Sequence, residues 1–218
     1  MSSSKNPWPT KDAMMQIYEK HLWGGEEYDF YSGYGSHDLQ IVQPYVDTVR
    51  AFFESHNQNL TVCDFGCGDF NIGKRLVQHT SKYIAIDIVP SLIERNKKLF
   101  KASNLEFHCL DISQDKLPEA DCVILRQVLQ HLSNKEVKRI VKKLINYRFI
   151  ILTENLPSSK FTRNTDIISG QGIRLKHNSG IDLLVQPFNL KVKSTKILSE
   201  VILEHKKGKI VSWLYELF

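Results

Sequence analysis

The fold is decided by the stretch Val62-Cys-Asp-Phe-Gly-Cys-Gly-Asp-Phe-Asn-Ile-Gly73. It begins as an apolar run typical of a buried strand and continues into a turn of small residues. Gly66 and Gly68 allow the backbone to come close to a ligand, and a helix is predicted after them, whose first N–H groups have no partner within the helix. The stretch therefore predicts a ligand-binding turn between a strand and a helix.

Further apolar runs, alternating with helical periodicity, extend this pattern along the chain. The predicted strands are Leu60–Phe65, Tyr83–Asp87, Leu105–Leu110, Asp121–Leu125 and Phe149–Thr153. Ser91–Phe100 and Lys135–Leu144 have the apolar spacing of helices. Nearly continuous apolar strands are expected where helices cover both faces of a parallel sheet. The prediction is an α/β fold with a doubly wound, mostly parallel sheet.

Two strand-like runs close the sequence. Lys193–Glu204 and Lys209–Leu217 are joined by a short link that contains Gly208, which predicts an antiparallel hairpin. Added to the preceding strands, this hairpin would complete a seven-stranded sheet.

Two segments lie outside this pattern. Residues 1–55 are predicted to be an N-terminal helical cap with a lid loop, comprising a helix that begins near Thr10 and runs to Leu22 and another over Leu39–Phe53. Residues 56–218 are predicted to be the core, and the polar stretch at about 155–186 is expected to be an insertion that faces the substrate.

The composition narrows the class of protein. The 218 residues carry a formal net charge of +5, and basic residues concentrate between Lys135 and Lys209. Many of them fall on the polar face of the predicted helix Lys135–Leu144, which favours a solvated surface; a nucleic-acid partner is the alternative. With no apolar run near the ~20 residues of a membrane span and no apolar leader, we expect a cytoplasmic protein without a membrane span.

The cysteines indicate neither a disulfide framework nor a metal centre. Their number is small for a chain of this length, and their spacing differs from that of paired zinc ligands. We expect reduced thiols at Cys63, Cys67, Cys109 and Cys122. The sequence also lacks a tight carboxylate cluster after the fourth predicted strand, so we expect activity that does not depend on a metal.

Acidic residues stand at the ends of three successive predicted strands. Asp87 ends the second strand about 20 residues beyond the glycines, where a carboxylate can accept both ribose hydroxyls of an adenosine. Asp64 and Asp111 belong to the first and third strands. Taken singly, Asp64 could cap the following helix and Asp111 could begin a turn through Ser113. Their joint placement favours a ligand site.

Together these residues resemble the class I S-adenosylmethionine-dependent methyltransferases, over about residues 60 to 155. The family's first motif appears as Asp64-Phe-Gly-Cys-Gly-Asp-Phe70, with Phe70 in place of the third glycine. That change disfavours a dinucleotide pyrophosphate and suits a ligand without phosphates. The resemblance implies a Rossmann-like methyltransferase fold and S-adenosyl-L-methionine as the cofactor, with S-adenosyl-L-homocysteine as its product.

The resemblance also implies roles for individual residues. Asp64 and the turn Gly66-Cys67-Gly68 would hold the methionine part of the cofactor, and Asp87 the ribose. The remaining implied contacts are to the adenine, whose edge would meet Asp111 and Ile112 and whose face would pack on Ile88.

A narrower resemblance is to a bacterial and viral branch associated with glycan biosynthesis. It rests on Trp23-Gly-Gly-Glu-Glu, Ser32-Gly-Tyr-Gly-Ser36, Tyr83-Ile-Ala-Ile-Asp87-Ile-Val, Leu125-Arg-Gln-Val-Leu-Gln-His-Leu-Ser133 and Asn164-Thr-Asp-Ile167. Members of that branch commonly have Asp where this chain has Gln127. The branch implies methylation of a sugar hydroxyl on a glycan or small polar acceptor.

Candidates for the chemistry follow the fourth predicted strand. His131 and Asp166 are the candidate proton acceptors, although His131 could instead be a hydrogen-bonded structural histidine. Arg126, at the strand tip, is expected to face the ligand crevice and to act in catalysis or cofactor binding.

The acceptor is expected to meet the two segments outside the core. Candidate contacts are Trp23, Tyr31, Tyr34 and Arg174. The aromatic residues, with Tyr28, could form a lid or simply anchor the cap to the core. The alternatives to a sugar methyltransferase are a nucleic-acid or protein methyltransferase and a non-catalytic, cofactor-binding scaffold domain.

Overall fold

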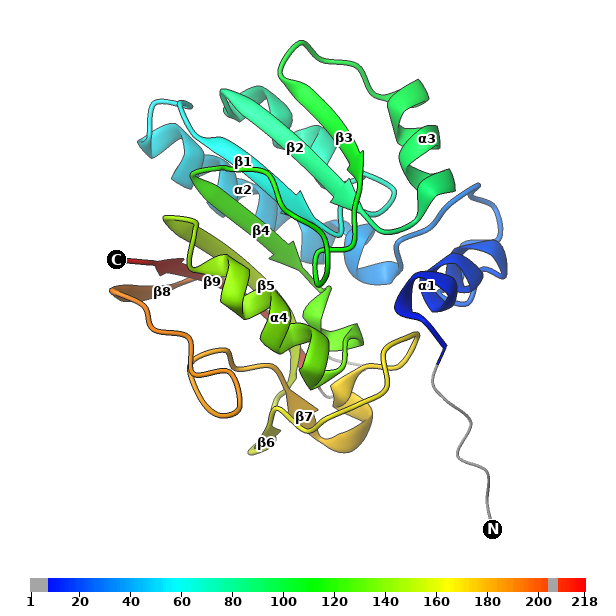
Figure 1. Ribbon diagram of the computed structural model, residues 1–218, viewed down its shortest axis with the longest axis vertical. Coiled ribbons are helices and arrows are strands. Elements are labelled where there is room, and N and C mark those ends of the chain that lie inside the picture. The colour runs from blue at the N-terminus through cyan, green and yellow to red at the C-terminus, as the bar shows by residue number, and fades with distance from the viewer. Residues whose placement is uncertain (1–7, 204–207) are drawn as a thin grey trace.

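The computed structural model describes residues 8–203 and 208–218 (Figure 1). These residues form a seven-stranded sheet in the order β3-β2-β1-β4-β5-β9-β8. Neighbours among β1 to β5 are parallel, whereas β9 runs antiparallel to both β5 and β8. The predicted fold class is therefore confirmed. The strands are β1 (Thr61–Phe65), β2 (Lys82–Asp87), β3 (Leu105–Cys109), β4 (Cys122–Arg126), β5 (Phe149–Pro157), β8 (Ser194–Leu203) and β9 (Gly208–Glu216).

The sheet order reverses beside β1. The chain passes from β1 outward to β2 and β3, and then returns to β4 on the other side of β1. At such a point the loops that follow neighbouring strands diverge and leave a crevice at the carboxyl ends of the strands. The glycine turn follows β1, Asp87 ends β2 and Arg126 ends β4. The topology therefore brings three predicted site segments to one edge of the sheet.

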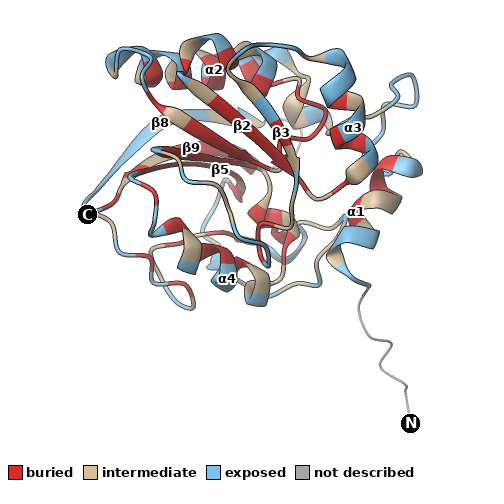
Figure 2. Ribbon diagram, turned by 45° about the horizontal axis from the view of Figure 1, so that its top comes forward, coloured by how far each residue is buried: buried red, intermediate tan, exposed pale blue. Residues whose placement is uncertain are grey.

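Helices cover both faces of this sheet (Figure 1). α2 (Leu39–Ser55) packs against one face, whereas α1 (Thr10–Glu19) and α4 (Asn134–Leu144) contribute to the apolar cluster on the other. α3 (Pro90–Leu99) begins with a proline at its first turn, as helices often do. Figure 2 shows buried residues on the central strands and on the inward sides of the helices. No helix within the described ranges has the length and apolar character of a membrane span.

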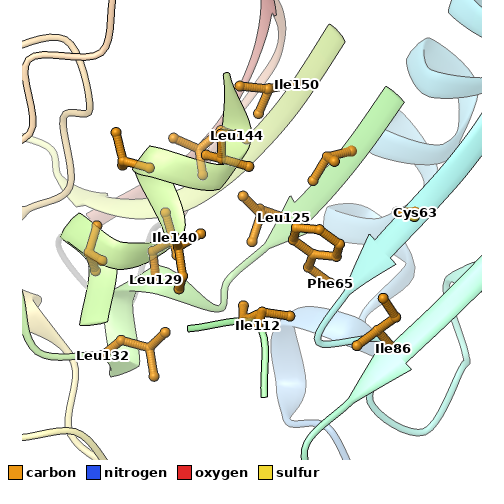
Figure 3. Packing of buried hydrophobic residues seen from close by; sticks show 14 of the residues in the cluster. Cys63, Phe65, Ile86, Ile112, Leu125, Leu129, Leu132, Ile140, Leu144 and Ile150 are labelled. Carbon is orange, nitrogen blue, oxygen red and sulfur yellow. The ribbon is translucent and has the colours of Figure 1, made fainter. Parts of the chain in front are cut away.

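The sequence of α4 explains its start and its orientation. Ser133 and Glu136 form a capping box that satisfies the first N–H groups. The predicted apolar stripe is buried, and Figure 3 shows Ile140 and Leu144 on the side of α4 that faces the sheet, near Leu125. Burying an aliphatic side chain of this size stabilises a fold by about 1.5–3 kcal/mol, so this stripe holds α4 on the sheet.

The structure changes the expected boundary of the N-terminal cap. Val42, Val49 and Phe53 of α2 are buried in the same cluster as Val62 and Tyr83 of the sheet. The prediction of a separate cap over residues 1–55 is therefore wrong for α2, which is a core helix. Residues 8–38 remain as the cap, in which α1 buries Met14, Ile17 and Tyr18 in the cluster on the other face of the sheet and ends at Glu19 rather than Leu22.

The helix expected after the glycine turn is also absent from the described structure. Its place is taken by two short 3-10 turns, η2 (Gly73–Arg75) and η3 (Val77–His79). Phe70 has a left-handed backbone with φ +64°, and a side chain at Gly73 would collide with the Phe70 ring. The chain between β1 and β2 therefore cannot wind a regular helix from its first residues.

The remaining elements surround the carboxyl edge of the sheet. β5 continues to Pro157, four residues beyond the predicted end at Thr153. The insertion that follows contains the short strands β6 (Thr162–Arg163) and β7 (Ser179–Gly180) and the turn η5 (Arg174–His177). The predicted hairpin pairing is confirmed by β8 and β9, whereas Glu204 and the link up to residue 207 lie outside the described residues.

Candidate active site

A cavity of about 360 Å³ lies at the carboxyl ends of β1, β2 and β4. Its walls come from the glycine turn, the loop after β3, the segment after β4, the cap and the insertion. The lining includes Tyr18, Trp23, Tyr34, Gly66, Gly68, Asp87, Ile88, Asp111, Ile112, Arg126, Gln127, Gln130, His131, Asn155, Gln171 and Lys176. Sequence segments that are far apart in the chain therefore line one cavity.

The glycine turn approaches the cavity closely because it carries no side chains. Gly66 and Gly68 have φ +76° and +56°, in the left-handed region that favours glycine. A side chain at Gly66 would stand 2.5 Å from Val128, and one at Gly68 would collide with the Ser32 hydroxyl. The backbone N–H of Gly66 donates to Ile86 O at 2.8 Å, which fixes the turn beside β2. The predicted turn is thus a preformed cradle of bare backbone.

Phe70 explains how the motif works without its third glycine. The residue keeps the positive φ that a glycine would adopt, at +64°. Its ring is fully buried and packs against Phe107 and Phe100, with centroid distances of 4.8 and 5.1 Å. The aromatic cluster stabilises a conformation that most residues avoid.

Asp87 projects from the end of β2 into the cavity wall. Its carboxylate accepts hydrogen bonds from the N–H groups of Gly68 and Val89, both at 3.1 Å. Burial raises the pKa of Asp87, and these hydrogen bonds oppose the rise. The carboxylate therefore orients the glycine turn and also presents an anionic group to a ligand.

The segment after β3 supplies the other predicted adenine contacts. Asp111, Ile112 and Ile88 all line the cavity. The Asp111 carboxylate accepts from Ser113 N at 2.8 Å and Gln114 Nε2 at 2.7 Å. Partial burial opposes ionisation, but the hydrogen bonds outweigh it and lower the pKa of Asp111. Asp111 therefore both begins the turn through Ser113, as considered from sequence, and lines the cavity.

Asp64 and Cys67 do not line the cavity, which corrects the roles that the family resemblance gave them. The Asp64 carboxylate faces the α2 side of β1 and accepts a hydrogen bond from Tyr83 OH at 2.8 Å. Burial raises the pKa of Asp64 to about 7. The Cys67 thiol is buried, and its Sγ lies 3.8 Å from Gly68 O. Both side chains are buried beside the turn, away from the cavity.

Arg126 connects the cavity to the cap. Its guanidinium lies 5.0 Å from the centroid of the Tyr45 ring and donates to Gly35 O and, at 3.2 Å, to Ser36 Oγ. A further N–H donates to Gln127 Oε1 at 3.1 Å. Burial lowers the pKa of Arg126. Arg126 therefore lies at the predicted crevice, and its contacts hold Gly35 and Ser36 of the cap against the end of β4.

His131 lies in the short turn η4 (Leu129–His131) and lines the cavity. Its Nδ1 is 3.2 Å from Gly170 O, which can only accept, so Nδ1 carries the proton. Nε2 is 3.3 Å from Gln130 Nε2. Burial lowers the pKa of His131 to about 4. The imidazole is therefore neutral at pH 7, with its unprotonated nitrogen available as an acceptor.

The aromatic residues of the cap divide into two groups. Trp23 and Tyr34 line the cavity, and the Trp23 ring lies 5.1 Å from the His131 ring. Tyr31 does not line it and instead stacks on Tyr28, at 5.2 Å, and on His37, at 4.4 Å. The predicted substrate contact at Tyr31 is therefore corrected to a packing role in the cap.

Arg174 and Asp166 also lie away from the cavity lining. The Arg174 guanidinium is 1% exposed and donates to backbone carbonyls, so its predicted contact with the acceptor is wrong. The Asp166 carboxylate accepts from the N–H groups of Asn134, at 2.7 Å, and Ile167, at 2.9 Å, near the start of α4. Its predicted role as a proton acceptor is replaced by a capping role.

Sequence reasoning missed three residues that shape the site. Glu154 is fully buried and accepts from the N–H groups at the start of η4. Ser32 and Asp69 exchange hydrogen bonds, with Ser32 N donating at 2.9 Å and Asp69 N at 2.8 Å. A glutamate inside an apolar strand run was a signal for Glu154. The pairing of Ser32 with Asp69 joins distant segments and leaves no local pattern.

Comparison with known proteins agrees with this geometry. Residues 62–147 match the family described as a methyltransferase domain. Phosphoethanolamine N-methyltransferase 3 of Arabidopsis thaliana is 26% identical over 95 residues, 41% of this chain and 19% of that protein. Malonyl-[acyl-carrier protein] O-methyltransferase of Acetivibrio thermocellus is 34% identical over 90 residues, 39% of this chain and 32% of that protein. The chain spans less than a third of the length of either curated relative.

Solved structures show the same fold over nearly the whole chain. The N-methyltransferase NodS from Bradyrhizobium japonicum WM9, in complex with S-adenosyl-L-homocysteine, has a TM-score of 0.64 at 12% identity and covers 94% of this chain and 99% of its own. The N-terminal domain of EvdMO1, in the presence of S-adenosylhomocysteine and D-fucose, has a TM-score of 0.58 at 14% identity and covers 97% and 98%. Residues 62–147 thus match a methyltransferase domain, and the chain has the fold of these solved methyltransferases.

Proposed function

We propose that this chain is an S-adenosylmethionine-dependent methyltransferase that methylates a hydroxyl group of a small polar acceptor, with a sugar hydroxyl favoured. The observation that carries the proposal is the position of His131. Its neutral imidazole lines the same cavity as the glycine turn and Asp87. A cofactor cradle and a proton acceptor therefore share one cavity.

The residues around the cradle fit this cofactor. S-adenosylmethionine supplies a methyl group that is already activated by the positive charge on sulfur. Asp87 would hold the ribose hydroxyls, the bare backbone at Gly66 and Gly68 would hold the methionine part, and Ile88 with Ile112 would contact the adenine. A side chain at Gly66 would meet Val128 and one at Gly68 would meet Ser32, so the turn keeps this shape only with glycine at both positions.

His131 would accept the proton that the hydroxyl loses. Its Nδ1–H is committed to Gly170 O, so Nε2 is the accepting nitrogen, and the acceptor hydroxyl would take the place of Gln130 Nε2, which lies 3.3 Å from it. The cavity orients the acceptor and excludes water, and as the acceptor oxygen is methylated its proton passes to Nε2. The lowered pKa keeps the imidazole unprotonated at neutral pH.

The remaining cavity wall suits a polyol. The side-chain amides of Gln127, Gln130 and Asn155 line it, together with the rings of Trp23 and Tyr34. Amides bond hydroxyl groups as donors and as acceptors, and aromatic faces cover the apolar faces of sugar rings. A domain with the same fold was crystallised in the presence of D-fucose, which also favours a sugar.

The test combines product detection with a matched pair of variants. The protein is incubated with S-adenosylmethionine and a panel of free sugars and methyl glycosides, and mass spectrometry detects products that have gained one methylene. Turnover should fall at least about 100-fold in His131→Gln, because general base catalysis contributes that much. The exposed His108→Gln on β3 should retain turnover. Calorimetry with S-adenosylhomocysteine should show equal affinity in both variants.

Different results would point to different errors. Full turnover in His131→Gln would remove the proposed base and leave the methyltransferase assignment intact. Products formed only on RNA, DNA or protein would replace the sugar acceptor. A wild-type chain that binds no S-adenosylhomocysteine would overturn the cofactor site and leave a scaffold domain.

A further inference from the structure

Glu154 and Arg174 are buried ionisable residues that do not line the cavity. Glu154 in β5 is fully buried and Arg174 in η5 is 1% exposed. A buried charge destabilises a fold unless its partners are well placed. Their partners therefore show what these two residues do.

Both residues hold the same short turn. The two carboxyl oxygens of Glu154 accept separately from Leu129 N, at 3.0 Å, and Gln130 N, at 3.1 Å. The two terminal nitrogens of Arg174 donate to Leu129 O, at 2.8 Å, and Leu132 O, at 2.7 Å. The carboxyl group thus meets the N–H groups and the guanidinium meets the carbonyl groups of the turn that contains His131.

Arg174 also holds the segment that orients the His131 ring. Its Nε donates to Thr165 O at 3.0 Å, and Gly170 lies within the same stretch of the insertion. Gly170 N donates to His131 O at 3.0 Å, while the His131 Nδ1–H donates to Gly170 O at 3.2 Å. One guanidinium therefore bonds both to the turn that contains His131 and to the segment that leads to Gly170.

Apolar packing alone does not set the direction of the peptide groups. Leu129 and Leu132 bury their side chains in the cluster that includes Leu125 and Ile140 (Figure 3). These contacts place the turn on the core. The paired hydrogen bonds to Glu154 and Arg174 add the directional constraint that hydrophobic contacts lack.

We infer that Glu154 and Arg174 are positioning residues for His131. They hold the turn so that Nδ1 carries the proton and Nε2 stays unprotonated, as a proton acceptor requires. The catalytic half of this inference rests on the proposed role of His131. Its structural half concerns the tautomer of the ring and is tested without an acceptor.

The experiment measures the His131 tautomer by long-range ¹H–¹⁵N correlation NMR of the imidazole ring, with the His131 signals identified by their loss in His131→Gln. The wild type is expected to show the neutral Nδ1–H form at pH 7. Glu154→Gln places an amide donor opposite one of the two N–H groups. Arg174→Lys keeps the positive charge but cannot donate to Leu129 O and Leu132 O from two planar nitrogens. Each should shift the Nδ1 resonance toward that of an unprotonated nitrogen.

A matched control separates positioning from general loss of stability. Thr153 and Ser212 share a buried hydrogen bond of 2.8 Å beside Glu154, and Ser212→Ala removes it without touching the turn. This variant should lower the melting temperature and leave the His131 resonances unchanged. All variants should bind S-adenosylhomocysteine with wild-type affinity, because neither Glu154 nor Arg174 lines the cavity.

Several results would overturn the inference. A wild-type ring in the Nε2–H form would do so without any variant. Unchanged His131 resonances in folded Glu154→Gln or Arg174→Lys would show that the charges only stabilise the fold. If these variants change the tautomer but His131→Gln keeps full turnover, the positioning stands and the catalytic role of His131 fails.

Discussion

Asp87 and Asp64 are buried carboxylates on adjacent strands, and their different neighbours give them different roles. Asp87 accepts from two backbone N–H groups and lines the cavity. Asp64 accepts from one tyrosine hydroxyl and lies between the sheet and α2. Position along the sheet explains the difference: Asp64 pairs with Ala85 inside the sheet, whereas Asp87 stands two residues further on, at the end of β2 beside the glycine turn.

Asp87→Ala should weaken binding of S-adenosylhomocysteine at least tenfold. Charge-assisted hydrogen bonds to the ribose contribute roughly 1.5–3 kcal/mol each, and the glycine turn also loses its bond from Gly68 N. Isothermal calorimetry measures the change, and Asp47→Ala on the exposed side of α2 is the control. An unchanged dissociation constant with a folded variant would remove Asp87 from the cofactor site.

Asp64→Asn should change how stability depends on pH. Burial raises the folded-state pKa of Asp64 to about 7, so the folded chain keeps a proton that the unfolded chain has lost between about pH 4 and 7. Asp64 therefore lowers the free energy of unfolding as pH rises through that window. The variant does not lose stability in this way. Its free energy of unfolding at pH 8 should exceed that of the wild type by up to roughly 4 kcal/mol, and the two should differ little near pH 4.

Urea unfolding at several pH values measures this effect. Tyr83 OH can still donate to the amide oxygen of the variant, so the packing of β1 on β2 is retained. If the free energies of unfolding of wild type and variant depend on pH in the same way, the pKa of the Asp64 carboxyl is not raised in the folded chain.

The positions at strand ends could be predicted from sequence, but the direction of their side chains could not in every case. Asp87, Asp111 and Arg126 follow apolar runs whose ends meet at one edge of a parallel sheet. The role of Asp64 was taken from a family motif, whereas its carboxylate lies on the α2 side of β1 and bonds to Tyr83 instead of lining the cavity. Arg174 was misplaced because its burial depends on carbonyl groups about 40 residues earlier in the chain.

At the scale of elements, the cap is fastened to the core by side chains from several segments. Arg95 of α3 makes two hydrogen bonds of 2.8 Å to Asp29 and one of 3.1 Å to Asp69 O. Arg126 of β4 holds Gly35 and Ser36. Movement of the cap away from the core would therefore break these contacts.

Arg126→Lys should speed the release of S-adenosylhomocysteine by about tenfold or more. Lysine keeps the charge but cannot bridge Gly35 O and Ser36 Oγ, and a hydrogen bond to a charged group contributes about 1.5–3 kcal/mol. Stopped-flow displacement measures the rate. Arg148→Lys is the matched control, since its guanidinium also lies over an aromatic ring, Phe149, but at the start of β5. Equal release rates would show that the Arg126 contacts do not restrain the lid.

Elements were predictable where burial forces a pattern and less so where local geometry overrides it. The central strands β2 and β4 are buried on both faces, and the stripe of α4 has the helical period. The region after the glycine turn lacks a helix because Phe70 adopts a left-handed conformation that its residue type does not signal. The assignment of α2 to the cap failed because amphipathicity shows which face is buried but not which partner covers it.

At the scale of the whole molecule, the positive charge lies mostly outside the cavity. Lys135, Lys138, Arg139 and Lys142 are exposed on α4, away from its buried stripe. Among the described residues, the basic side chains Arg126, Lys176 and His131 line the cavity, and the last is neutral at pH 7. An acceptor held in the cavity therefore meets little of the net charge of +5.

The dependence of acceptor binding on salt distinguishes a small acceptor from a nucleic acid. Because few cations line the cavity, the KM for a sugar acceptor should change by less than about twofold between about 50 and 200 mM salt. A nucleic acid that contacts six to ten phosphates through the exposed lysines would lose about 10³ to 10⁵ in affinity over that range. Lys138→Glu on α4 should leave the KM for a sugar unchanged, whereas it would weaken a nucleic-acid complex. A steep salt slope with RNA or DNA, and no product with sugars, would replace the proposed acceptor while keeping the methyltransferase fold and its cofactor.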